Sequence, residues 1–249
     1  MKVQFRQFKQ SIHEKLIFKF SKVNRLGISA NFIKGEGIEI GALDYPLRVS
    51  PEATVKYVDR ISAEAHAKIF TDMSLSRMVK VDIIDDGETL LTIGDATQDF
   101  VIANHFIEHC QNPAQTIENL LRVVRKGGIV FMAIPDKRYT FDINRELTSM
   151  AHFLKDYREG ASWSEGDHYE DFVRKTVWSK DAKTDDDIKK VIAHLKEINF
   201  SIHFHVWSHP TMIDFFQMLR HELSFPFEIE LSVAPQKNSN EGVFILKKT

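Results

Sequence analysis

Cysteine and long hydrophobic runs are what this sequence has least of. Its 249 residues include one cysteine, Cys110, and no apolar run reaches the roughly 18 residues of a membrane-spanning helix. The single cysteine excludes a disulfide scaffold, and polar residues interrupt the first stretch, MKVQFRQFKQ, as they would not in a signal peptide. The apolar content of 43% excludes a disordered chain. We expect a soluble, cytoplasmic protein with an ordinary core.

An excess of positive charge is also missing, because the net charge is −2. This argues against a protein that binds nucleic acid along its whole length. The charge is uneven, since residues 1–34 carry +7 and the remainder −9. Apolar residues recur there every three or four positions, which predicts a basic amphipathic helix. We interpret its charge as a solvated face, and peripheral contact with anionic lipid or a partner stays open.

Short apolar runs begin after residue 34 and predict strands buried on both faces of a parallel sheet. They are Gly37–Ile40, Thr54–Val58, Val81–Ile84, Phe100–Ala103 and Ile129–Ile134. Between the last two, Asn112 and Pro113 predict the start of a helix, and Gly127–Gly128 predicts its end. The pattern is that of an α/β domain over residues 35–135.

Two further segments follow this domain. Residues 136–207 show one clear helical pattern, Asp187 to Asn199, and we interpret this long insertion as a lid and acceptor region. In residues 208–249, Ser208 and Pro210 open a helix, and Phe227–Val233 and Val243–Lys247 predict a closing antiparallel hairpin.

Acidic residues stand where three successive strands end. Glu39 is followed by Gly41, Asp59 ends the next strand, and Asp86–Gly87 follows the third. Ligands bind at this edge of doubly wound sheets, and an acid at the position of Asp59 typically receives ribose hydroxyls. Of the glycine fingerprint G-x-G-x-x-G only Gly41 remains, which disfavours a dinucleotide cofactor. Each acid taken alone fits an ordinary loop residue, so the three together carry the prediction.

These segments resemble the class I S-adenosylmethionine-dependent methyltransferases, closest to the type-11 group. The resemblance lies in IEIGALDYPL, YVDRIS, DDGETL, DFVIANHFIEHCQNP and LRVVRKGGIVFMAIPD, and covers about residues 35–136. It implies a doubly wound, Rossmann-like α/β sheet of seven strands with an antiparallel last strand. The implied cofactor is S-adenosylmethionine, with S-adenosylhomocysteine as product. The residues that the resemblance places at the cofactor are Glu39 at the methionine amino end, Gly41 and Ala42 in the turn, Asp59 with Arg60 at the ribose, Asp86 and Gly87 at the adenine, and Asn104 near the methionine.

Catalytic candidates follow from the chemistry of methyl transfer. An oxygen acceptor must lose a proton, and His105 and Asp136 follow the fourth and fifth strands, with His205 as a third candidate base. Beyond Asp136, cations suit a phosphorylated or carboxylated acceptor, since arginine binds such groups bidentately. The candidate acceptor residues are Arg138, Tyr139, Asp142, Arg145, His203 and Trp207.

The acceptor class rests on a second resemblance. PDKRYTFD and HFHVW are similar to segments of methyltransferases associated with bacterial surface-polysaccharide synthesis, which implies a sugar or nucleotide-sugar acceptor. His203 and His205 would share one face of an extended segment, and His152 and His168 lie in the same insertion. No third ligand is fixed by this spacing, so we expect no metal.

Alternatives remain open at this point. A quinone or lipid methyltransferase at a membrane surface would use the basic amphipathic segment, and a cofactor-binding module without activity would serve a partner enzyme. An NAD-dependent oxidoreductase is disfavoured by the missing glycines. The sequence leaves the oligomeric state and the choice between oxygen and nitrogen methylation undecided.

Overall fold

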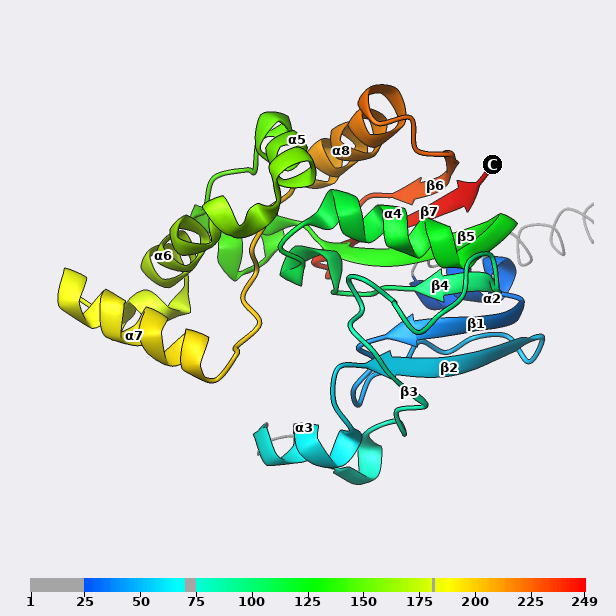
Figure 1. Cartoon of the computed structure of the whole chain (residues 1–249), viewed down its shortest axis with the longest axis horizontal. Helices are drawn as coiled ribbons and strands as arrows, with labels where there is room; N and C mark the ends of the chain where they lie inside the picture. The colour runs from blue at the N-terminus through cyan, green and yellow to red at the C-terminus, as the bar shows by residue number, and fades with distance from the viewer. Residues whose placement is uncertain (1–24, 70–74, 181) are drawn as a thin grey trace, which may run out of the picture.

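A mixed sheet of seven strands forms the centre of the computed structural model, which describes residues 25–69, 75–180 and 182–249 (Figure 1). Its order is β3-β2-β1-β4-β5-β7-β6; the first five strands run parallel, and β7 lies antiparallel between β5 and β6. The strands are β1 Gly35–Ile40, β2 Ala53–Asp59, β3 Ile83–Ile84, β4 Gln98–Ile102, β5 Val124–Pro135, β6 Phe227–Val233 and β7 Glu241–Lys248. This confirms the predicted fold class.

The two faces of the sheet carry separate cores, as strand β5 illustrates. Successive side chains of a strand point to opposite faces, so Val130 and Met132 join one cluster and Ile129 and Phe131 the other. The larger cluster is covered by α4 Pro113–Val123, α5 Met150–Glu159 and α8 His209–Glu222. The smaller cluster is covered by α2 Arg25–Phe32. Strands β1, β4 and β5 are therefore largely buried on both faces, as their apolar runs predicted. Strands β2 and β3 lie toward one edge of the sheet and are mostly part-exposed, so the prediction of burial on both faces is wrong for them.

Helix α4 begins as predicted but ends earlier. Asn112 caps it by accepting a hydrogen bond of 3.1 Å from the Gln115 backbone. The helix stops at Val123, and Gly127–Gly128 lies within β5, so the prediction that these glycines end the helix is wrong. Val124 already pairs with Gln98 of β4, so β5 begins directly after the helix. The register between β4 and β5 then shifts, and Phe100 pairs with Ile129.

The insertion contains three helices where the sequence predicted one. They are α5, α6 Glu165–Lys175 and α7 Asp185–Glu197, which starts two residues before its predicted position. The buried side of α5 holds Asp156 beside Phe153, so its apolar periodicity is broken. Helices α6 and α7 have a hydrophobic cluster of their own, which includes Phe172, Leu195 and Phe204.

The remaining helix, α3 Ala63–Ile69, connects β2 to β3. Residues 1–24, which hold most of the predicted basic amphipathic helix, lie outside the described residues. Within the described part of the chain, no helix has the length and apolar character needed to cross a membrane.

Candidate active site

The carboxyl ends of β1 and β4 meet where the strand order reverses, which is the usual ligand position in such sheets. Gly41 leaves β1 with φ +63°, a conformation that favours glycine. Its backbone N–H donates to the Val58 carbonyl, and among the described residues, apart from its chain neighbours, no atom lies within 4 Å of the place where a Cβ would stand. Ala42 follows it, 9% exposed. The turn therefore leaves room for a ligand against the backbone.

The side chain of Glu39 fixes the conformation of this turn through hydrogen bonds. Its side chain is buried, and its two carboxylate oxygens accept hydrogen bonds of 2.9 and 3.1 Å from the Leu47 backbone N–H. Burial raises the pKa of Glu39 to about 7, against the opposing effects of the Leu47 hydrogen bond and the nearby Arg25. The carboxylate thus fixes residues 41–47 instead of pointing at an open ligand position.

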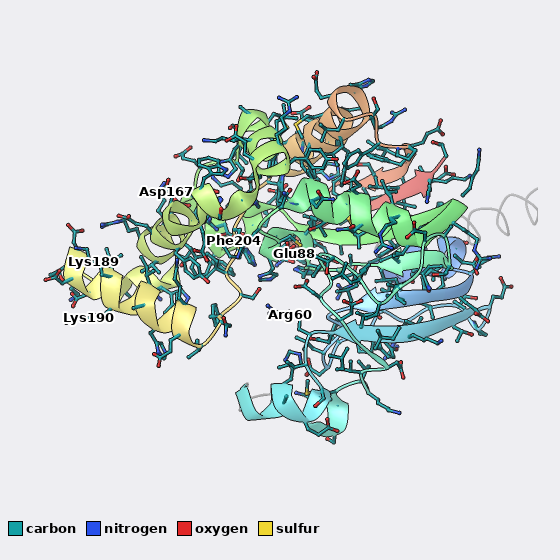
Figure 2. The ribbon with its side chains drawn as sticks, viewed as in Figure 1. Arg60, Glu88, Asp167, Lys189, Lys190 and Phe204 are labelled. Atoms are coloured by element: carbon teal, nitrogen blue, oxygen red, sulfur yellow. The ribbon has the colours of Figure 1, made fainter. Side chains whose placement is uncertain are left out.

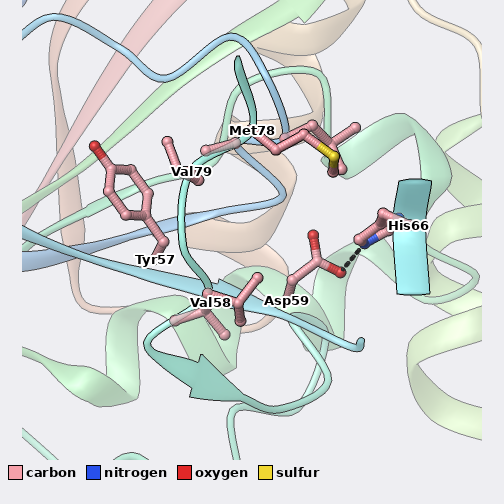
Figure 3. A pocket seen from close by; sticks show the side chains of 9 residues that line it. Tyr57, Val58, Asp59, His66, Met78 and Val79 are labelled. Atoms are coloured by element: carbon pink, nitrogen blue, oxygen red, sulfur yellow. Dashed lines mark hydrogen bonds and ion pairs between the residues drawn. The ribbon is translucent and has the colours of Figure 1, made fainter. Parts of the chain in front are cut away.

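Asp59 lines the pocket drawn in Figure 3, at the end of β2. Its Oδ1 lies 2.8 Å from His66 Nε2 of α3. The pocket is lined by Ala42, Leu43, Tyr57, Val58, Asp59, His66, Met78, Val79 and Val81. Arg60 follows Asp59 and is exposed (Figure 2).

The loop after β3 approaches β1 closely. A Cβ at Gly87 would lie 2.5 Å from Ile40 Cγ2 and 2.8 Å from Phe106 Cζ, so glycine is required there. The Asp86 side chain accepts a hydrogen bond of 2.8 Å from the Glu88 backbone. Glu88 was not singled out by the sequence, yet burial and then Asp86 raise its pKa to about 7.

The end of β4 is held by polar side chains. Asn104 Oδ1 accepts a hydrogen bond of 2.9 Å from the Ala133 backbone and so ties β4 to β5. His105 has φ +47°, and its Nε2 lies 2.7 Å from Glu241 Oε2 while its Nδ1 lies 3.5 Å from Glu108 Oε1. Burial opposes its charge, but the two carboxylates prevail and raise the pKa of His105 to about 9. A protonated imidazole cannot accept a proton, so this geometry weighs against His105 as a base at neutral pH.

The carboxylate of Asp136, the second candidate base, is buried and hydrogen-bonded. Asp136 is 1% exposed. Its carboxylate accepts hydrogen bonds of 2.9 and 2.6 Å from the Arg138 side chain and one of 2.8 Å from the His209 backbone N–H. Burial would raise the pKa of Asp136, but these donors hold it below its usual value. The residue joins β5 to the start of α8. Arg138 is half exposed and lies 5.6 Å from the centre of the exposed Tyr139 ring.

Arg145 is an internal residue, 1% exposed, although the sequence placed it at the acceptor. It donates to Asp142 at 2.9 Å, to Asp171 at 2.7 Å and to the carbonyl oxygens of His203 and Phe204. Asp142 also lies 2.7 Å from His203 Nδ1. This network joins the insertion to residues 203–204 and leaves the guanidinium no room for an acceptor.

His203 and His205 do not share a site, contrary to the expectation from their spacing. His203 lies beside His109 and Glu108, and these three residues offer ligand atoms within 4.8 Å of one another. His109 Nδ1 donates a hydrogen bond of 3.0 Å to the Ile202 carbonyl. Burial keeps the pKa of His109 below its usual value. His205 is buried on the other side of the segment, with Nε2 3.1 Å from the Gln111 carbonyl. Burial holds the pKa of His205 well below its usual value.

Trp207 is also internal. It is 2% exposed and stacks on Phe153 with ring centres 5.3 Å apart. The third candidate base, His205, and the candidate acceptor residue Trp207 therefore lie inside the molecule.

Comparison with known proteins identifies a methyltransferase domain within this chain. Residues 47–132 match the type-11 family model described as a methyltransferase domain. That span runs from the loop that Glu39 holds, through β2, β3 and β4, into β5. This stretch of the chain is a methyltransferase domain. The chain is therefore a methyltransferase, and its cofactor is S-adenosylmethionine. No curated protein matches the sequence.

Solved structures resemble the methyltransferase in fold. A Rhodobacter sphaeroides protein named as a zinc-dependent alcohol dehydrogenase is 12% identical, with a TM-score of 0.51, over 88% of this chain and 85% of that one. A methyltransferase from Thermotoga maritima is 18% identical, with a TM-score of 0.47, over all of both chains. One from Methanosarcina mazei is 13% identical, with a TM-score of 0.44, over 91% of this chain and 98% of that one.

Proposed function

We propose that this methyltransferase transfers a methyl group to a small polar acceptor, a sugar or nucleotide-sugar intermediate of surface-glycan synthesis. The observation that carries the proposal is the half-exposed Arg138, which two hydrogen bonds to Asp136 fix over the exposed Tyr139 ring, directly beyond the end of β5. A guanidinium beside an aromatic face suits a sugar that carries phosphate. The acceptor would enter at the same sheet edge as the cofactor.

The residues present fit S-adenosylmethionine. The open backbone at Gly41 and Ala42 would receive the methionine part, and Asp59, with Arg60 beside it, would receive the ribose hydroxyls. The loop of Asp86 and Gly87 would receive the adenine. Glu39 and Asn104 would act through the loops that their hydrogen bonds position. The bound cofactor supplies an electrophilic methyl group, and the protein orients the acceptor in line with it and excludes water.

An oxygen acceptor also needs a base, and His109 is the candidate that the geometry favours. Its Nδ1 proton is committed to the Ile202 carbonyl, so Nε2 carries the lone pair. Its lowered pKa keeps the ring neutral near pH 7. The protonated His105 beside the buried Glu108 would instead orient polar groups of the acceptor.

A calorimetric titration with S-adenosylmethionine, S-adenosylhomocysteine and NADH comes first. We expect binding of the first two alone. Release of S-adenosylhomocysteine is then followed with sugar nucleotides, and with a quinol and a lipid as competing acceptors. Turnover with sugar nucleotides that falls in Arg138→Ala, but not in the exposed control Arg174→Ala, supports the proposal. Turnover with the quinol or lipid alone would overturn the acceptor class, and cofactor binding without any turnover would favour a partner module.

A further inference from the structure

Four potential metal ligands meet inside the insertion. They are His152 and Asp156 of α5, His168 of α6, and His205 of the segment before α8; one ligand atom from each lies within 4.8 Å of all the others. His152 and Asp156 are four residues apart, so a helix places both on one face. Ser149 fixes the start of α5 by accepting a hydrogen bond from the His152 backbone.

The distances within this cluster suit a tetrahedral ion. His152 Nε2 lies 3.1 Å from His168 Nε2 and 3.2 Å from Asp156 Oδ2, and His205 Nε2 lies 3.6 Å from the same oxygen. Bonds of about 2.0–2.1 Å to zinc separate tetrahedral ligand atoms by about 3.3–3.4 Å. The observed separations scatter around this value.

The surroundings of the Asp156 carboxylate are stronger evidence for a bound cation than the distances are. The Asp156 side chain is completely buried, and its Oδ1 accepts a hydrogen bond of 2.9 Å from Trp163 Nε1. Its Oδ2 has no hydrogen-bond partner in the part of the chain that the structure describes. Among the described residues, its ion-pair partners are His152 and His205. The nearby Arg145 is engaged by Asp142 and Asp171. A buried carboxylate without a cation is costly, and a metal ion would compensate it.

We propose that His152, Asp156, His168 and His205 bind one zinc ion, which fastens α5 and α6 to the segment before α8. Three imidazoles with one carboxylate select zinc over magnesium or calcium, which prefer oxygen ligands. His205 joins by exchanging its contact with the Gln111 carbonyl for the ion. A set of four protein ligands is typical of a structural site. The role is separate from methyl transfer.

The test uses the full chain without an affinity tag, purified from zinc-supplemented cells, and measures metal by mass spectrometry. We expect about one zinc per chain, and a loss of roughly tenfold or more in zinc content in His168→Gln and Asp156→Asn. His194→Gln, at an exposed position of α7, is the matched control and keeps its zinc. Chelation should lower the melting temperature of the wild type and leave that of His168→Gln unchanged.

Two further arms keep the proposal falsifiable if a variant folds poorly. Cobalt added to the chelated wild type should give the intense visible bands of tetrahedral coordination. In His109→Gln, which removes a ligand from the Glu108, His109 and His203 cluster, zinc should be retained. A wild type without zinc, a six-coordinate cobalt spectrum, or zinc lost in His109→Gln but kept in His168→Gln would each overturn the site.

Discussion

The carboxyl edge of the sheet and the insertion use charged residues in opposite ways. At the edge, Glu39 accepts a hydrogen bond from the backbone of Leu47 and Asp86 from that of Glu88, so each acid shapes its own loop. In the insertion, Arg145 bonds Asp171 and His203 bonds Asp142 across 26 and 61 residues. After β1 and β3 the acids bond to neighbouring backbone and shape their loops. In the insertion, long-range pairs bury charge and hold α6, whose apolar residues cluster with those of α7 apart from the cores of the sheet.

The substitution Arg145→Met should have the largest effect, because it removes the cation that the long-range pairs of the insertion share. The change leaves Asp142 and Asp171 without the guanidinium and two carbonyl oxygens without a donor, which should cost about 3–5 kcal/mol of stability. We expect the loss to be concentrated in α6 and the 203–204 segment, measured by urea unfolding and amide hydrogen exchange. Arg174→Met, on the exposed side of α6, is the control and should change little. Equal loss of protection in the sheet would contradict a separately held insertion.

A change at the sheet edge should act through packing instead. Gly87→Ala forces a Cβ to within 2.5 Å of Ile40 Cγ2, which should cost about 1–3 kcal/mol and displace the loop that we assign to adenine. Thermal unfolding measures the loss. In Gly166→Ala, on α6, the added Cβ meets nothing within 4 Å, so that control should be neutral or more stable by up to about 1 kcal/mol. Unchanged stability of Gly87→Ala would refute the tight approach.

Asp59→Ala tests whether the pocket at the end of β2 binds the cofactor. Loss of a charged acceptor for the ribose hydroxyls should weaken S-adenosylmethionine binding by more than about tenfold. Calorimetry of the variant measures this, and Asp95→Ala, which removes a highly exposed carboxylate that pairs with Arg122, is the matched control. The assignment of the ribose to this pocket fails if both variants bind equally.

The smallest effect should be a pH dependence from His105. Its pKa is raised from 6.5 to about 9, so its contribution to stability is complete below pH 6.5 and lost as the pH rises through about 9. Melting temperatures between pH 6 and 10 should therefore decline more for the wild type than for Glu241→Gln, which removes the carboxylate 2.7 Å away. Glu228→Gln, exposed on β6, should follow the wild type. Parallel curves for all three proteins would show that the pair of His105 and Glu241 contributes nothing to the pH dependence of stability.

The sequence alone predicted the sheet, because its evidence is local. Apolar runs marked the strands, and Asn112 with Pro113 marked the start of α4, whereas the number of seven strands was implied by the family resemblance. It missed α5 and α6, since a helix whose buried face carries Asp156 has no regular apolar period. It also placed Arg145 at the acceptor, whereas this arginine is 1% exposed and bonded to Asp142 and Asp171.

Only the tertiary structure decided which polar residues face the site and which lie inside. His203 and His205 are two residues apart, yet one joins Glu108 and His109 and the other joins His152, Asp156 and His168. Such groupings depend on how helices from distant parts of the sequence pack, and spacing along the chain does not encode that. The physical reason is that a backbone pattern follows from neighbouring residues, whereas the partner of a buried charge is set by the whole fold.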